Sequence, residues 1–492
     1  MTEKDPWLPD TRREPVRRAA GPYLAGERHA GPQQDRRPPR RTSQPASQDR
    51  SWRGPTGREI STEPTVPAVT PVRRPEIQAT PRDSLPPEAE TETEPEAETE
   101  TEPETTLARP LYWTVLACCA VLLQVILFSN SGYSWHFFAE AAQLLIGQHP
   151  TGMDLPGGLH LYANYPDLQF GPFTVLVTVA LQPFSDGGWF IVTWFMTICG
   201  LVVLYLVERT VRVLRPDIDI TSRAMALTMI VGGGSFIVSW ELLAVHFGHL
   251  DDVLALTFLA FAVAAVVYRS PMLAGLFLGL AVDSKPWALV CAALLLVFPM
   301  RLLWRGLLVT AVVVGVAWLP FVLADSHTLS AAASFTIPNV PASALHALGV
   351  NAQNTPSWDR EAQIGVGCVL GLIALIRRRW EAVFALGIGA RIALDPSVYT
   401  YYTAGLALGL LLWDLVGYRK PVPLLSVLCF LGLTLALTLV HDNQVLGELR
   451  LWTVLITSVL MLTLPRGPIR RTRSSVLDNV RGRLPASRRQ WD

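Results

Sequence analysis

The sequence predicts an all-α fold, a polytopic bundle of transmembrane helices that follows a disordered N-terminal tail. Half of the 492 residues are hydrophobic and 17% are charged. The mean hydropathy is +0.31, and the charges gather in the two tails and in short clusters between apolar runs. A soluble chain of this length would form about three domains, but this distribution of charge is typical of an integral membrane protein.

Composition divides the chain into three parts. Residues 1–106 are rich in Pro, Arg, Ser and Thr, and 83–108 carry ten acidic residues and no basic one. Because few apolar residues cluster there, the segment cannot bury enough surface to offset the entropy of ordering, and we predict a disordered tail. This tail is either a solvated tether or a binding segment. Residues 107–465 form the membrane domain, and 466–492 form a basic tail with eight Arg and two Asp.

Long apolar runs predict about 11 to 13 membrane spans. The first run, 111–128, is long enough to cross a hydrocarbon core of ~30 Å at about 1.5 Å per residue. The run 272–299 is too long for one upright span and contains Asp283-Ser284-Lys285-Pro286, so we expect two short helices that meet at a polar turn. The other candidate spans are 168–184, 189–207, 224–245, 253–268, 306–324, 363–376, 381–394, 398–417, 422–440 and 447–464.

Arginine clusters orient these spans, because basic residues near span ends favour the cytoplasmic side. In the C-terminal half the clusters lie at 301–305, 377–379, 419–420 and after Pro465. They predict a multi-pass protein of the plasma membrane with a cytoplasmic C-terminal tail and outer loops at 129–168 and 325–362. The basic residues at 209–223 favour the cytoplasmic side as well. We also expect the N-terminal tail in the cytoplasm, and the two expectations together strain the rule. Whether the number of spans is odd or even therefore stays open.

The expected outer loop 129–168 contains a helix and several polar groups. Within SWHFFAEAAQLLIGQ the apolar residues share one helical face, while His136 and Glu140 lie on another. Such a helix would lie along the membrane surface, either as an ordinary interfacial helix or as one that lines a substrate site. His160 and Asp167 follow among aromatic residues. These residue types at a membrane surface suit a site for a sugar or a lipid headgroup.

The motif HFGHLDD places His249, Asp251 and Asp252 directly between two apolar runs. Charged groups at membrane depth cost roughly 2.5–3.5 kcal/mol each on insertion scales, so they usually mark a function or a pairing. Two acids beside a histidine could supply a general base or bind a cation. The alternative is structural, since Asp251 or Asp252 could cap the N-terminus of the helix that follows.

Two further motifs place cations near polar turns. In AVDSKPWALV, Lys285 ends a short helix, where it could bind the phosphate of a lipid carrier or pair locally with Asp283. In ARIALDPSVYTYY, Arg391 and Asp395 lie four residues apart, with Tyr399 beyond them. This spacing fits either an ion pair at a helix end or the recognition of a diphosphate.

No motif for a cofactor is present. The six cysteines lie within apolar stretches without zinc-ligand spacing, and the sequence has no Gly-rich phosphate loop, no GxSxG and no HExxH. We therefore predict no cofactor, no metal-ligand set and no nucleic-acid partner, while a requirement for a divalent metal stays open.

Between residues 110 and 465 these features resemble the C-type integral membrane glycosyltransferases. A first span is followed by a long outer loop and then by YANYPDLQFGPFTVLVTVALQPF, which leads into the next span. GHLDDVLALTFLAFA, followed by RSPMLAGLFLGLAVDSKPWALVCAALLL, is similar to the pattern of glycosyltransferase family 87. The resemblance implies the C-type architecture for the helix bundle.

The resemblance also implies a function. Members of this family transfer a sugar, often mannose, from a polyprenyl-phosphate carrier to a lipid or glycan acceptor on the outer side of the membrane. The expected partners are thus a polyprenyl-phosphate-sugar donor, an acceptor of that kind and membrane lipids, and inversion at the anomeric carbon is expected.

The resemblance carries over to particular residues. The family usually places its catalytic aspartate just after the first span, where this chain reads NSGYSWHFF. The expected catalytic residues are therefore His136, Asp167, Asp251 and Asp252. The residues expected to bind substrate, with Lys285 or Arg391 facing the phosphate, are His160, His249, Lys285, Arg391, Asp395 and Tyr399.

Two other functions compete with this one. In a secondary transporter or flippase, Asp251, Asp252 and His249 would carry protons or cations, and a symmetry between the two halves of the chain would favour that reading, but the sequence shows none. In a non-catalytic assembly partner, the tails would recruit cytoplasmic proteins.

Overall fold

The computed structural model describes residues 108–150, 152–184, 189–399, 401–418 and 422–465. All of these belong to one compact unit, Ala97–Asp492. The predictions for the two tails, 1–106 and 466–492, lie outside the described residues. The described chain forms helices and loops without a strand, apart from one isolated antiparallel bridge between Pro338 and Asn354. The predicted all-α fold is thus confirmed.

Within the described residues, six helices are long and apolar enough to cross a membrane, so the protein is membrane-embedded. They are α1 (Ala108–Phe128), α5 (Trp189–Leu214), the continuous helix Arg223–Phe247, α8 (Leu250–Val267), α10 (Met300–Ala324) and α18 (Asn443–Thr463). The helix Arg223–Phe247 consists of α6 (Arg223–Thr228), η3 (Met229–Gly233), α7 (Gly234–Glu241) and η4 (Leu242–Phe247).

Shorter helices complete the bundle and its loops. Those within the bundle are α9 (Pro271–Ser284), η5 (Pro286–Val297), α13 (Asp359–Ile376), η6 (Trp380–Ala382), α14 (Val383–Ala393), α15 (Tyr402–Leu412), η7 (Trp413–Tyr418), α16 (Leu424–Cys429), η8 (Phe430–Leu435) and α17 (Ala436–Leu439). Those in the loops are α2 (Trp135–Leu145), η1 (Gly158–His160), α3 (Leu161–Asn164), α4 (Pro172–Leu181), η2 (Gln182–Phe184), α11 (Thr328–Ser334) and α12 (Ala344–Ala347).

The predicted break in the run 272–299 is confirmed. Helix α9 ends at Ser284, Lys285 is extended with φ −147°, and η5 begins at Pro286. The break follows from the proline, which has no N–H to donate to the preceding turn and disfavours helical geometry in the residue before it. The extended backbone turns the Lys285 side chain away from the axis of its own helix.

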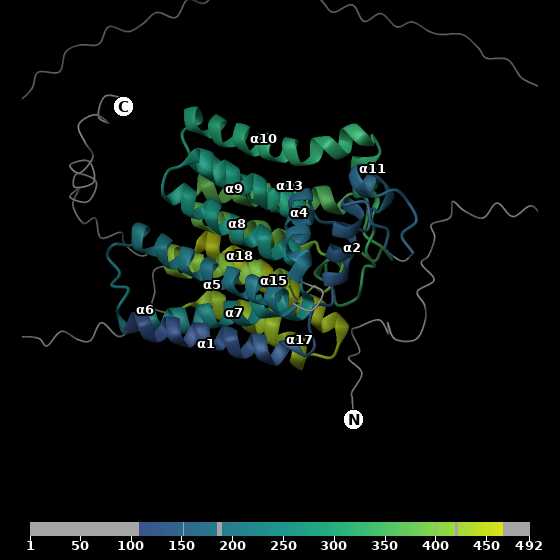
Figure 1. Ribbon diagram of the computed structural model, residues 1–492. Coiled ribbons are helices and arrows are strands. Elements are labelled where there is room, and N and C mark those ends of the chain that lie inside the picture. The colour runs from purple at the N-terminus through teal and green to yellow at the C-terminus, as the bar shows by residue number, and fades with distance from the viewer. Residues whose placement is uncertain (1–107, 151, 185–188, 400, 419–421, 466–492) are drawn as a thin grey trace, which may run out of the picture. The chain divides into compact units, whose positions relative to one another are not determined.

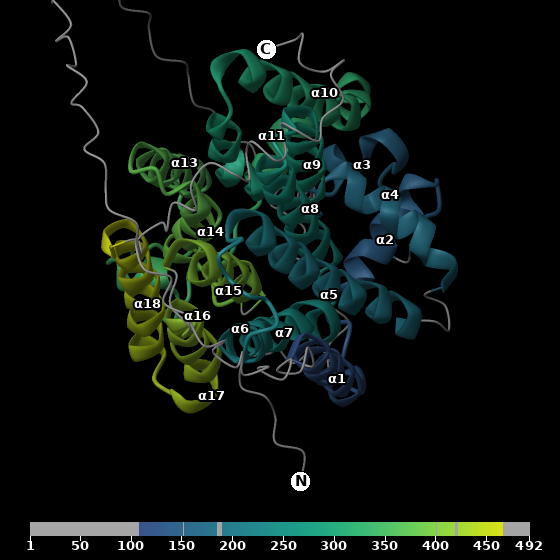
Figure 2. The ribbon, with the colours of Figure 1, turned by 90° about the vertical axis from the view of Figure 1, so that its left-hand side faces the viewer.

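Helix α8 lies at the centre of the bundle. In its most apolar stretch 83% of residues are buried, against 11% in α10, which forms an outer wall. Helix α8 packs against α5 and α9, and α9 packs against α10. Figure 1 shows the long helices side by side, and Figure 2, turned to face one end of the bundle, shows α8 between α5 and α9 with α10 and α1 at the periphery.

One end of the bundle collects the polar loops. Helices α9 and α14 end there, and helices α8 and α13 begin there. The contacts of Lys285 with Asp251 and of Arg391 with Gln363 show that these four helix termini lie together. We call this the site end. Helices α2, α4 and α11 gather beside it, on the right in Figure 1.

Helix α4 does not cross the bundle, although the sequence predicted a span at 168–184. Its N-terminus is bonded to the end of α9, where the N–H of Gly171 donates to the carbonyl of Ser284 at 2.9 Å. The chain then returns to the same end, because the Trp189 indole at the start of α5 donates to Ser131, just after α1, at 2.7 Å. Figure 1 shows α4 lying across the direction of the long helices. This run is apolar because it is buried against α2 and α9.

Candidate functional site

Two buried carboxylates lie in the first turn of α8. Gly248, at φ +67°, allows the chain to turn sharply out of η4, and His249 occupies the N-cap position of α8. Asp251 and Asp252 are 0% and 1% exposed. The alternative that one of these acids is the N-cap residue is therefore wrong, because the helix begins before either of them.

Lys285 reaches across from the break after α9 to these acids. Its ammonium contacts a carboxylate oxygen of Asp251 and lies 3.9 Å from Oδ2 of Asp252. The alternative of a local pair with Asp283 is wrong, because the extended backbone at Lys285 directs its side chain towards α8. Lys285 thus neutralises part of the charge that α8 buries.

Asp252 keeps one carboxylate oxygen available. Its Oδ1 accepts a hydrogen bond from the indole N–H of Trp287 at 2.7 Å. Its Oδ2 is buried and has no hydrogen-bond partner among the described residues. A buried acceptor without a partner is uncommon in a folded protein, and here it marks the oxygen that could receive a proton from a substrate.

His249 joins the acids to the first outer loop. Its Nε2 lies 3.0 Å from the hydroxyl of Ser134, and its Nδ1 lies 3.5 Å from Oδ1 of Asp251 and 3.9 Å from Oδ2 of Asp252. The ring lies against that of Tyr401, with centroids 3.9 Å apart.

These three residues also have the chemistry of a cation site. His249, Asp251 and Asp252 each offer one ligand atom, and the three atoms lie within 4.8 Å of one another. A divalent ion there would compete with the ammonium of Lys285 for the same carboxylate oxygens.

Arg391 is buried near the end of α14 on the other side of Trp287. It donates to Oε1 of Gln363 at 3.2 Å and to the hydroxyl of Tyr402. Its guanidinium lies over the rings of Tyr402 and Trp287, 4.1 Å and 5.6 Å from their centroids. Its Nε has no hydrogen-bond partner in the part of the chain that the structure describes.

Asp395 and Tyr399 lie in the turn beyond Arg391. The carboxylate of Asp395 accepts from the backbone N–H of Ser397 at 3.1 Å, and within the described chain it forms no ion pair with Arg391, whose donors go to Gln363 and Tyr402. Burial raises the pKa of Asp395 to about 6 and that of Tyr399 to about 12. The two residues flank Arg391 and do not line the cavity described next.

A cavity of about 210 Å³ brings three cations together. Lys285, Arg391 and Arg360, from the first turn of α13, all line it, and Nη2 of Arg360 has no partner among the described residues. The remaining lining residues are Leu168, Gln169, Phe170, Pro286, Trp287, Val290, Trp318, Ala332, Ala333, Phe335, Gln363 and Ile364. The cavity is thus positively charged with largely apolar walls.

Three expected site residues lie elsewhere. His136 is exposed on α2, with its ring against that of Phe137. Asp167 is exposed, and His160 is exposed with its Nδ1 3.3 Å from Asp325 at the end of α10. None of the three lines the cavity. The helix expected around His136 does form, but its buried face is the apolar one, so its polar face points away from the bundle.

Arg360, Trp287 and Ser134 belong to the site but were not identified from the sequence. The sequence does mark Arg360, because it is a charged residue in the first turn of an apolar helix. Trp287 directly follows the helix break. Ser134 could not be found, since its relevance depends on the contact with His249, 115 residues further along the chain.

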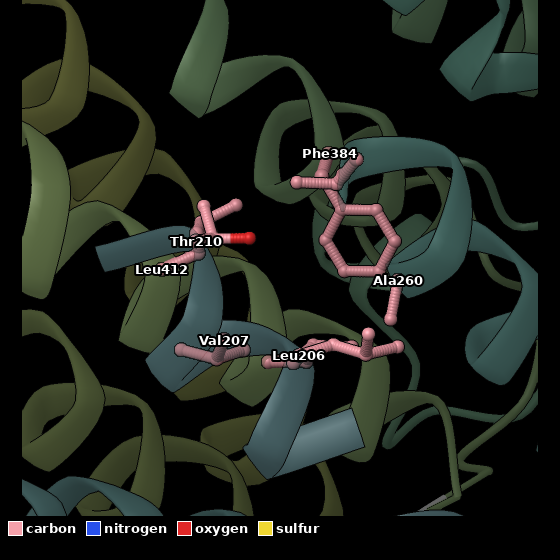
Figure 3. Close-up of a pocket in the computed structure, with 8 residues that line it drawn as sticks. Leu206, Val207, Thr210, Ala260, Phe384 and Leu412 are labelled. Atoms are coloured by element: carbon pink, nitrogen blue, oxygen red, sulfur yellow. The ribbon is translucent and has the colours of Figure 1, made fainter. Parts of the chain in front are cut away.

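A second, much smaller cavity lies between α5, α8, α14 and α15 (Figure 3). Its volume of about 20 Å³ is close to what one water molecule needs, and Thr210 is the polar residue among those labelled in Figure 3. It offers no chemistry for a substrate.

In comparisons with protein-family models, curated proteins and solved structures, none matches this chain.

Proposed function

We propose that this protein is a membrane glycosyltransferase of C-type architecture, similar to family 87. It moves a hexose from a polyprenyl-phosphate-sugar to a lipid or glycan acceptor on the outer side of the plasma membrane. One observation carries the proposal: Lys285, Arg360 and Arg391 line one cavity, while Asp252, hydrogen-bonded to Trp287 of that cavity, has a carboxylate oxygen without a hydrogen-bond partner among the described residues.

The cavity suits the phosphate of the donor. Lysine binds phosphate as a point charge and arginine binds it through directed N–H donors. Arg391 and Arg360 each have a buried nitrogen without a hydrogen-bond partner in the described chain, and Lys285 is mostly enclosed, so their charges act in a medium of low dielectric. Apolar walls from Trp318, Phe335 and η5 fit the first isoprenyl units of the carrier.

The acids suit the acceptor. The acceptor hydroxyl oxygen attacks the anomeric carbon, the bond from that carbon to the phosphate oxygen breaks, and its electron pair leaves with the polyprenyl phosphate. The proton of the hydroxyl passes to Oδ2 of Asp252. The three cations stabilise the charge that develops on the leaving phosphate. Attack opposite the leaving group inverts the anomeric configuration.

We also propose a membrane topology with twelve crossings of the described chain. It takes the six membrane-length helices and, as shorter crossings, α9, η5, α13, α14, α15 with η7, and α16 with α17. Because α4 does not cross, this number is even, and the two ends of the described chain lie on the same side of the membrane. The arginine-rich ends, at 209–223, 301–305 and 377–379, lie opposite the site end and face the cytoplasm in this topology, in agreement with the rule that basic residues favour that side.

A transfer assay tests the proposal. Purified protein in proteoliposomes receives polyprenyl-phosphate-mannose or polyprenyl-phosphate-glucose together with membrane lipids, and mass spectrometry detects hexose on lipid. We expect transfer by the wild type and by Asp154→Asn, which changes an exposed acid of the outer loop, and a loss of about 100-fold or more for Asp252→Asn. Movement of the donor across the bilayer without transfer would instead identify a flippase, and equal transfer by all variants would refute the assignment of the base.

A further inference from the structure

A serine, a histidine and an aspartate line up at the site end. The hydroxyl of Ser134 lies 3.0 Å from Nε2 of His249, and Nδ1 of the same ring lies 3.5 Å from Oδ1 of Asp251. We propose that these three residues form a nucleophilic triad with acyl-transfer activity towards acyl esters at the outer membrane surface. Its nucleophile and base differ from the groups of the proposed glycosyl transfer, which uses Asp252 and the cationic cavity, although Lys285 both contacts Asp251 and lines that cavity.

Backbone hydrogen bonds hold the nucleophile against its base. The N–H of Ser134 donates to the carbonyl of Phe247 at 2.8 Å, and the N–H of Gly132 donates to the carbonyl of Val245 at 3.1 Å. Both carbonyls lie just before His249. Ser134 occupies the N-cap position of α2, but its side chain makes no capping hydrogen bond. Its hydroxyl points to the imidazole instead, although capping is what a serine at this position usually does.

The histidine is oriented for base catalysis. A carboxylate on the Nδ1 side favours the tautomer with its proton on Nδ1, which leaves the lone pair of Nε2 facing the hydroxyl of Ser134. Asp251 is itself fixed by Lys285 and by the N–H of Asp252 at 2.8 Å. Nδ1 of His249 forms no hydrogen bond among the described residues, and its separation of 3.5 Å from Oδ1 of Asp251 exceeds a hydrogen bond. Such catalytic contacts are often long before substrate binds.

The chemistry is that of an acyl-enzyme. Nε2 of His249 takes the hydroxyl proton while Oγ of Ser134 attacks the ester carbonyl carbon, and the positive end of the α2 helix dipole stabilises the oxyanion that forms. The ester C–O bond then breaks, and the leaving alkoxide takes the proton from His249. Water or an acceptor hydroxyl releases the acyl group by the reverse steps.

The surroundings of the triad favour an acyl chain. Phe137 on α2 and Ile146, the residue that follows α2, are 42% and 51% exposed at the site end. The rings of Phe138, Phe247 and Tyr401 surround His249. The chemical class of the substrate is therefore an ester of a long-chain acyl group presented by the outer leaflet.

Covalent labelling tests the triad on the full-length protein in detergent. A fluorophosphonate probe should phosphonylate Ser134 of the wild type, as peptide mass spectrometry detects. Ser134→Ala should remove this adduct, and His249→Asn should slow its formation about 100-fold or more. The matched control is Ser131→Ala, which alters a serine three residues away whose hydroxyl donates to the carbonyl of Phe128. Absence of an adduct at Ser134, or an unchanged rate in His249→Asn, would overturn the proposal.

A pair of cysteine variants guards against misfolding as an explanation. Ser134→Cys should react with iodoacetamide at least about 10-fold faster than Ser131→Cys at pH 7, because the imidazole beside it favours the thiolate. Size-exclusion profiles of the two variants serve as the check of folding. Equal reactivity in two well-folded variants would show that His249 does not activate position 134.

Discussion

Removing the ammonium of Lys285 should destabilise the site end through Asp251. Lys285→Met keeps the length of the side chain but leaves a fully buried carboxylate without its cation. Breaking a buried ion pair from one side costs about 3–5 kcal/mol. Asp251 keeps a hydrogen bond from the N–H of Asp252 and the nearby ring of His249, so we expect the lower end, about 3 kcal/mol.

A double-mutant cycle isolates this interaction. Asp251→Asn alone should cost a similar amount, since Lys285 then faces only Asp252 at 3.9 Å. The double variant should lose less than about 1.5 kcal/mol, because replacing both charges of a buried pair is often near neutral. The free energy of unfolding is measured in mixed micelles with rising SDS content, by tryptophan fluorescence. Arg305→Met, an exposed arginine away from the site, is the control and should change stability by about 0.5 kcal/mol or less. Additive losses in the cycle would refute a direct Lys285–Asp251 pair.

Three further predictions use the same unfolding measurement. Gly171→Ala should lower the free energy of unfolding by about 1–3 kcal/mol, because its Cβ would lie 1.8 Å from a backbone carbonyl of α9. Gly365→Ala, whose Cβ meets nothing within 4 Å, should raise it by about 0.5–1 kcal/mol. Equal effects of the two substitutions would contradict the close approach of α4 to α9. Asp414→Ala should lower the free energy of unfolding by about 2 kcal/mol, because Asp414 accepts hydrogen bonds from two backbone N–H groups at the start of α16. A loss below about 0.5 kcal/mol would show that this cap contributes little. Burial raises the pKa of Asp395 to about 6, above the ~3.9 of an unfolded chain. The folded protein therefore binds the extra proton, and stability should fall as pH rises from about 4 to about 6; Asp395→Asn should flatten this slope, and an unchanged slope would assign it to another group.

Local sequence patterns predicted the all-helical fold, the helix break after α9 and several of the charged residues that are buried. The proline after Lys285 marked the break between α9 and η5, because its effect on the backbone does not depend on distant residues. The rule that charges within apolar runs mark function or pairing selected Asp251 and Asp252, and the spacing of Arg391 and Asp395 selected Arg391. Asp251, Asp252 and Arg391 are all buried at the site end.

The pairing of these residues could not be predicted. Lys285 meets Asp251 and not its near neighbour Asp283, because the direction of an extended residue at a helix break depends on the packing of α9 against α8. Composition alone also could not show that α4 packs across the helix ends, since a buried short helix and a membrane span are equally apolar. His136 was expected at the site from its helical face, but that face points outward.

The most direct test is a structure of the protein solved by cryo-electron microscopy with a polyprenyl phosphate bound. Our account predicts phosphate density in the cavity between Lys285, Arg360 and Arg391, with the isoprenyl chain leaving past Trp318. Phosphate density at the opposite, arginine-rich end of the bundle, or an empty cavity at saturating ligand, would contradict it.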